Sequence, residues 1–209
     1  GVVYSYDEDE SGDISSDATN PMDISFVGAG EYLISGSAAN YQTANADPEY
    51  FTIEIPLGYE LRRMRMVEFE QVGYEAAGEP AGNGGFLGIG DGDTMPVIAS
   101  PADFVPAANA LFGGALVGII PGSQAGDNVL DDLASPFAFP AFGIDIPGFS
   151  GTLGAGVYTF FFKEGNSHAD VVDAYINYSF ALEVSLEDED DNLEGSFSFT
   201  RTFTASATD

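Results

Sequence analysis

The first candidates for chemistry are acidic side chains close to the N-terminus. Residues 7–17 read DEDESGDISSD and offer Asp7, Asp9, Glu10, Asp13 and Asp17 as oxygen donors. A calcium ion takes six to eight oxygen ligands, and a tight glycine-containing turn can gather several carboxylates around one ion. We therefore interpret this segment as a calcium-binding region, with a solvated acidic leader as the alternative.

The segment does not follow the calcium loop of helix–loop–helix proteins. Asp7, Asp9 and Ser11, with Gly12 and Ile14 after them, imitate the first two-thirds of such a loop. The twelfth position, where a bidentate glutamate belongs, is Ala18, and no flanking helices are evident. A calcium site here must be built from other partners.

Two further acidic groups are weaker candidates. Asp91 and Asp93 flank Gly92, and an Asp-Gly-Asp turn brings two carboxylates close together, although a plain surface turn is the favoured interpretation. The run at 187–191 reads EDEDD and is typical of a solvated hairpin tip, with loose binding of divalent cations as the alternative.

Catalysis finds little support in the sequence. His168 is the single histidine, it lies in a polar stretch, and no serine or cysteine stands in a recognisable triad with it. The many carboxylates leave a glycosidase-like acid pair open, but nothing singles one out, and the chain has no Trp to stack against a sugar. We expect a non-enzymatic protein.

The charge balance excludes several partners. The 209 residues carry 34 acidic and 5 basic side chains, for a formal net charge of −29. Nucleic acids and anionic lipids bind through Lys and Arg, so we expect neither as a partner. The longest apolar run, 111–121, is too short to span a bilayer and is broken by glycines, so no membrane insertion is expected. The chain has no Cys, which excludes disulfides and thiolate metal sites.

Hydrophobic periodicity predicts an all-β domain. Apolar residues alternate at every second position over many short segments, separated by Gly and Pro. This pattern favours an antiparallel β-sandwich or jelly roll with long irregular loops and at most one or two short helices. The expected strands are 22–27, 31–35, 49–55, 60–70, 85–90, 157–163, 175–186 and 196–205.

The stretch 92–150 is harder to interpret. It is rich in Gly, Pro and Ala with scattered Phe residues, which indicates long connections packed by their own aromatic rings. We expect a short strand at 116–120 and a brief helix at 127–133, with Asp127 as its N-cap. The aromatic loops are expected to cover one end of the core, and a rim that binds sugar or peptide is the alternative.

Three of the five basic residues occupy one predicted strand, 60–70. Alternation puts Arg63 and Arg65 on one face and Arg62 on the other, and it leaves open which face is buried. We expect the three arginines to pair with surrounding carboxylates, with capture of an anionic ligand as the alternative.

The order of these segments resembles the bacterial pre-peptidase C-terminal domains, which are secreted β-sandwich modules attached to proteases, collagenases and surface proteins. The motifs that carry the resemblance are SGDIS at 11–15 with Asn20-Pro21 after it, the strand and turn at 30–36, DPEYFTIEIPLGYEL at 47–61, FLGIGDG at 86–92, GTLGAGVYTFFFKEG at 151–165 and YSFALEV at 178–184. Together they cover about residues 5–185. The stretch 92–150 is longer than the family requires, and residues 187–209 lie beyond its usual last strand.

The resemblance implies a structural calcium ion between strands, bound by acidic residues of the N-terminal turn together with Asp47 and Glu49. It also implies a domain layout: an acidic segment 1–17 packed on or leading into the domain, a sandwich over 18–186, and an extra strand or linker over 187–209. The location it implies is extracellular, secreted or at the cell surface, with neighbouring domains in a larger chain.

We therefore expect a non-catalytic, calcium-binding β-sandwich module of an exported or cell-surface bacterial protein. It would bind an extracellular glycan or peptide, or act in adhesion. The main alternative is a structural spacer in a large adhesin, where calcium stiffens the junctions between domains. A glycan-active hydrolase is the weakest alternative. The chain starts at Gly1 in polar sequence, as a processed or excised protein would.

Overall fold

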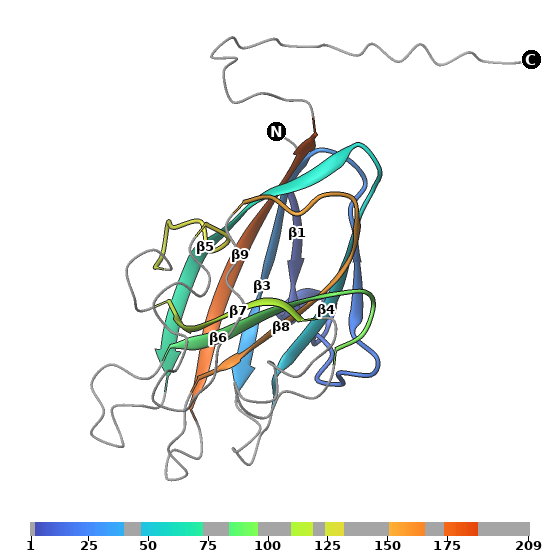
Figure 1. Ribbon diagram of the computed structural model, residues 1–209. Coiled ribbons are helices and arrows are strands. Elements are labelled where there is room, and N and C mark those ends of the chain that lie inside the picture. The colour runs from blue at the N-terminus through green and yellow to red at the C-terminus, as the bar shows by residue number, and fades with distance from the viewer. Residues whose placement is uncertain are drawn as a thin grey trace, which may run out of the picture.

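The protein folds as a β-sandwich of two sheets that face each other (Figure 1). The computed structural model describes residues 3–39, 47–72, 84–95, 110–118, 124–131, 151–165 and 174–187. The predicted all-β sandwich is confirmed. Among the described residues, no helix has the length and hydrophobicity needed to cross a membrane.

The first sheet has four strands. Their order is β1 (Val3–Asp7), β3 (Gly30–Ala39), β9 (Tyr175–Leu186) and β5 (Tyr59–Val72). The two pairs made by β9 are antiparallel, whereas β1 and β3 run parallel. The residues of β1 belong to segment 1–17, which we expected to be packed on or leading into the domain; these five residues pair along β3 as part of the sheet.

The second sheet has five strands. Their order is β2 (Met22–Ser25), β4 (Glu49–Ile55), β8 (Gly156–Glu164), β6 (Gly85–Asp91) and β7 (Ala110–Val117). The edge pair β2–β4 is parallel and the other pairs are antiparallel. Both sheets are thus mixed, because consecutive strands cross between the sheets and two edge strands then run alongside a neighbour in the same direction.

Most predicted strands are found close to their expected bounds, but the stretch 92–150 differs. The strand expected at 116–120 is β7, which begins earlier, at Ala110. The helix expected at 127–133 is wrong over its described part, 127–131, which forms turns. Its backbone pairs with β5 instead: Met66 N–H donates to the Asp127 carbonyl at 3.1 Å and Val129 N–H donates to the Met64 carbonyl at 2.8 Å. Residues 132–150 and the strand expected at 196–205 lie outside the described residues.

The core lies between the two sheets and is rich in aromatic rings. Phe162 of β8 packs edge-on against Tyr178 and Phe180 of β9, with ring centroids 5.0 and 5.1 Å apart. On β5 the buried residues are Leu61, Met64 and Met66, so the arginine face is the outer one. A register shift between Leu61 and Arg63 breaks the simple alternation expected for this strand.

The two ends of the sandwich differ in what they contain. We call the end where β1 begins and β9 finishes the terminal end; there Val3 pairs with Glu31, which pairs with Glu183 (Figure 1). We call the opposite end, where β3 finishes and β4 begins, the acidic end. The short helix α1 (Glu8–Ser11) follows β1 at the acidic end. Ser37 lies six positions after Glu31 in β3, which is about 20 Å along the strand.

Candidate functional site

Three carboxylates from separate elements meet at the acidic end. They are Glu8 of α1, Asp13 of the loop after it, and Glu49, the first residue of β4; one oxygen from each lies within 4.8 Å of the others. We call this group the carboxylate cluster. Glu49 lies 36 residues after Asp13 and 41 residues after Glu8, so the fold and not a local turn brings it to the other two.

Glu49 points into the sandwich. Along β4 it shares a face with Phe51, Ile53 and Ile55, which are core residues, and it pairs across the ladder with Phe162. Its exposed fraction is 0%, and neither carboxylate oxygen accepts a hydrogen bond from a donor. Burial raises the pKa of Glu49 to about 11, with further contributions from the negative charges of Glu8, Asp47 and Asp13. The carboxyl groups of Glu49 and Glu8 can form a hydrogen bond with each other only when one of them holds a proton, which also favours the protonated form of Glu49.

Glu8 is fixed by backbone donors. Its Oε1 accepts from Ile14 N–H at 3.0 Å and its Oε2 accepts from Ser37 N–H at 2.7 Å. The carboxylate lies against Gly36, where a Cβ atom would collide with Oε2. Burial raises the pKa of Glu8, the two N–H donors oppose that shift, and the charges of Asp13 and Asp47 add to it. Glu8 therefore ties the loop after α1 to β3.

Asp13 and Asp47 complete the acidic surroundings. Asp13 is largely exposed, and burial of part of its side chain together with the charge of Asp47 raises its pKa. Asp47 accepts from Ser16 Oγ at 2.8 Å, and its backbone carbonyl accepts from Ala39 N–H at 2.7 Å. The cluster thus has a buried side, formed by Glu49, and a side nearer solvent, formed by Asp13.

A buried hydroxyl lies beneath the cluster. Tyr178 of β9 pairs with Gly36, the residue on which the Glu8 carboxylate lies. Its ring is in the core and its hydroxyl group has no hydrogen-bond partner. Burial raises the pKa of Tyr178 well above its ordinary value, and the charges of Glu49 and Glu8 lead the remaining causes. A buried polar group normally has a hydrogen-bond partner, so the unpaired hydroxyl group indicates that a partner is missing at this position.

The structure brings some of the predicted metal ligands together. Asp13 and Glu49 are both in the carboxylate cluster, and Asp47 is near enough to raise the pKa of each. Glu8 was not among the predicted ligands. The alternation that puts Glu49 on the face of Phe51 and Ile53 was a usable signal for its burial, whereas nothing in the acidic run distinguishes Glu8 from its neighbours.

The other predicted ligands have different roles or positions. Asp7 caps α1 and accepts from Asp9 N–H at 3.0 Å, while Asp9 and Glu10 are exposed on α1. Asp17 accepts from the N–H and hydroxyl of Thr19 at 2.8 and 2.7 Å, and these bonds lower its pKa.

Asp91 and Asp93 lie away from the cluster. Asp91 pairs with Tyr158, which pairs with Ile53, four residues along β4 from Glu49. That separation is about 13 Å along the strand, too far for shared ligation. Asp93 is exposed and also lies outside the carboxylate cluster.

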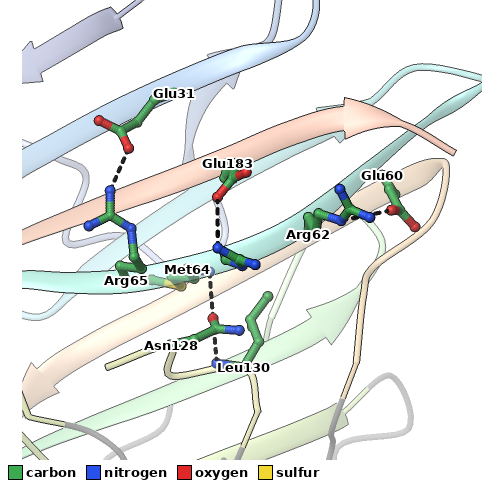
Figure 2. Close-up of polar contacts among 9 residues, drawn as sticks. Glu31, Glu60, Arg62, Met64, Arg65, Asn128, Leu130 and Glu183 are labelled. Carbon is green, nitrogen blue, oxygen red and sulfur yellow. Dashed lines mark hydrogen bonds and ion pairs between the residues drawn. The ribbon is translucent and has the colours of Figure 1, made fainter. Parts of the chain in front are cut away.

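The arginines of β5 pair with carboxylates on the outer face, as expected (Figure 2). Arg65 pairs with Glu31 of β3, Arg63 with Glu183 of β9 at 3.9 Å, and Arg62 with Glu60 at 3.7 Å. Figure 2 also shows how the turn at 124–131 covers the edge of β5, where Asn128 Oδ1 accepts from Met64 N–H at 2.9 Å. His168 and most of the aromatic-rich stretch 104–149 lie outside the described residues.

Comparisons with protein-family models, with curated proteins and with solved structures found no match to this chain. The resemblance to pre-peptidase C-terminal domains therefore stays a prediction. The carboxylate cluster offers oxygen donors only, and these are the ligands of hard cations.

Proposed function

We propose that this chain is a non-catalytic β-sandwich module that holds a calcium ion in the carboxylate cluster of Glu8, Asp13 and Glu49. The observation that carries the proposal is the buried Glu49 carboxylate, which has no donor and faces two other carboxylates. A buried charge costs several kcal/mol unless it is neutralised by a proton or by an opposite charge.

No positive charge is among the groups that shift the pKa of Glu49 in the described part of the chain. The groups that act on its pKa are all acidic: Glu8, Asp47 and Asp13. A divalent cation between these oxygens would replace repulsion by attraction, and ligation would stabilise the ionised form of each carboxylate. The Tyr178 hydroxyl oxygen, an unpaired acceptor beneath the cluster, fits the same interpretation.

The donor set favours calcium over other cations. The cluster contains no His and the chain contains no Cys, so the donors preferred by zinc and copper are absent from it. Magnesium demands near-ideal octahedral geometry, whereas calcium accepts irregular sets of six to eight oxygens. Carboxylates drawn from a helix, a loop and a strand make an irregular set.

The burial of Glu49 supports an ion held within a ligand-binding or adhesion module over a spacer with calcium at its junctions. A junction ion is shared between the surfaces of two domains, whereas the Glu49 carboxylate is fully buried inside this one. In line with the predicted resemblance to pre-peptidase C-terminal domains, we propose that the module belongs to an exported or cell-surface bacterial protein. It would present loops that bind a glycan or a peptide.

Calcium titration of the thermal unfolding midpoint tests the ion site. We expect calcium at about 100 times its dissociation constant to stabilise the fold by about 2.7 kcal/mol, which corresponds to about 5–10 °C for a chain of this length. The same ionic strength supplied as NaCl is the reference, because any salt screens a net charge of −29.

The matched variants are Glu49→Gln and Glu54→Gln, two substitutions of the same chemistry on the same strand. Glu54 is the exposed residue of β4. Glu49→Gln should abolish most of the calcium response, and Glu54→Gln should retain it. Equal calcium responses in wild type and Glu49→Gln would remove the ion from the cluster. Glycan and peptide arrays probed in calcium would then separate a binding module from a spacer, which should bind nothing.

A further inference from the structure

The carboxylate cluster by itself offers few oxygen ligands for a calcium ion. Glu8, Asp13 and Glu49 bring three carboxylates together, whereas calcium takes six to eight oxygens. On the side of Asp13, which is exposed, water can supply further ligands. Glu49 closes the opposite side and is fully buried, so a further ligand on that side must come from the core of the sandwich.

Tyr178 is placed to supply a ligand from the core. It pairs with Gly36, against which the Glu8 carboxylate lies. Its side chain is only 2% exposed, and its ring packs against Phe162 and Phe180 with centroids 5.0 and 5.4 Å away. These contacts fix the direction of the ring, so the position of its hydroxyl group is set before any ion binds.

The hydroxyl group of Tyr178 has the chemistry that this side of the site requires. It has no hydrogen-bond partner, and after burial the charges of Glu49 and Glu8 are the largest causes of its raised pKa, so it lies within electrostatic range of both. A further carboxylate in the core would add another negative charge away from water, whereas a neutral oxygen adds none. A bond to a cation would also satisfy a polar group that is otherwise unpaired.

We propose that the hydroxyl oxygen of Tyr178 is a ligand of the ion and completes its coordination from the core side. This inference rests on the calcium site proposed above. The ion then lies between Glu49 of β4, in the second sheet, and Tyr178 of β9, in the first, so it joins the two sheets as well as binding the carboxylates. The same hydroxyl group would lower stability when no ion is bound and raise the affinity for calcium.

Tyr178→Phe tests both effects of the hydroxyl group. In chelator, without calcium, the variant should melt about 2–4 °C higher than the wild type, because it removes a buried polar group that has no partner. Its dissociation constant for calcium, measured by isothermal titration calorimetry, should be at least about tenfold higher. Opposite changes in metal-free stability and in calcium affinity distinguish a ligand from a packing residue, since a packing defect would lower both.

Two variants control for the loss of a polar group from the core. Gln71→Met removes a side-chain amide that is also buried without a hydrogen bond, on the neighbouring strand β5. It should raise the metal-free melting midpoint and keep the calcium affinity of the wild type. Tyr32→Phe removes a hydroxyl group that is bonded to Val27 and Gly28, so it should lower the midpoint and leave the affinity unchanged.

Each outcome decides the proposal. If Tyr178→Phe binds calcium as tightly as the wild type, Tyr178 is not a ligand, and the carboxylate cluster stands as the ion site without it. Equal losses of affinity in Tyr178→Phe and Gln71→Met also overturn the proposal, because the effect would then belong to polar groups of the core in general. A lower metal-free midpoint for Tyr178→Phe overturns it too, since the hydroxyl group would already have a partner. A wild type that does not bind calcium overturns the proposed function together with this inference.

Discussion

Two groups of charged side chains in this molecule differ in burial and in the sign of their neighbours. On the outer face of the first sheet, Arg63 and Arg65 pair with Glu183 and Glu31, and all four side chains are at least one-third exposed. At the acidic end, Glu8, Asp13 and Glu49 are charges of one sign, and Glu49 is fully buried. The opposite charges of the first group neutralise each other, whereas the carboxylates of the second group need protons or a cation to neutralise them.

The difference teaches that the abundance of carboxylates does not locate a site in this protein. Most of the acidic side chains that the structure describes are at least partly exposed, so water solvates them at little cost, and exposed ion pairs contribute about 1 kcal/mol or less. A large free-energy cost arises where a carboxylate is buried without a hydrogen-bond donor, and Glu49 is such a carboxylate. The following experiments sharpen or break this contrast, from the largest expected effect to the smallest.

The pH dependence of stability without calcium should be the largest effect. The pKa of Glu49 is about 11 in the folded protein against an ordinary 4.5, so between about pH 5 and 8 the folded state holds a proton that the unfolded state has lost. Stability is then highest below pH 4.5 and falls as pH rises, by at most about 1.4 kcal/mol per pH unit. Urea unfolding in metal-free buffer from pH 5 to 8 measures the slope.

Glu49→Gln is the control for that slope. The variant removes the group with the largest shift and should give a clearly shallower profile over the same range, with the raised pKa values of Glu8 and Asp13 as the remaining contribution, and saturating calcium should flatten the profile of the wild type. If wild type and Glu49→Gln lose stability equally with pH, Glu49 is not the group responsible and the contrast between the two charged groups fails.

Gly36→Ala should give the second effect. The new methyl group would displace the Glu8 carboxylate, which then loses its hydrogen bonds from Ile14 and Ser37. We expect a loss of about 2–3 kcal/mol in the free energy of unfolding, since each of these bonds involves a charged acceptor. Most of the calcium response should be lost as well, although no carboxylate has been removed.

Gly154→Ala is the matched control for Gly36→Ala. A Cβ atom at Gly154 meets no atom within 4 Å, so its effect should stay within about 0.5 kcal/mol. A Gly36→Ala variant with an unchanged calcium response would show that Glu8 does not need this position to take part in the site.

Arg65→Ala should have the smallest effect. Its pair with Glu31 is partly exposed, so we expect a loss of about 1 kcal/mol or less, which 1 M NaCl should remove. A double-mutant cycle with Glu31→Ala isolates the pair. The calcium response should equal that of the wild type. A reduced response would show that the ion pairs of the outer face affect calcium binding at the carboxylate cluster, so that the two groups are not independent.

The sequence predicted the strands well where one face is buried. β9 was predicted with its observed bounds because Tyr178, Phe180, Leu182 and Val184 alternate strictly, and a period of two has few other structural interpretations. The helix expected at 127–133 failed because the spacing of Val129 and Leu130 is also satisfied by a turn whose backbone pairs with the edge of β5. Local periodicity contains no information about an edge 60 residues away.

By itself, the sequence determined the all-β class, most strand positions and the acidic character of the N-terminal segment. Each of these follows from side-chain alternation, turn residues and charge, which act over a few neighbouring residues. Only the tertiary structure decided which carboxylates meet. Glu8 joins Asp13 and Glu49 because β1 pairs with β3 and sets α1 beside the first residue of β4, and because Gly36 leaves space for its carboxylate. Those are long-range pairings, and a cluster formed by them has no signature at any single position of the chain.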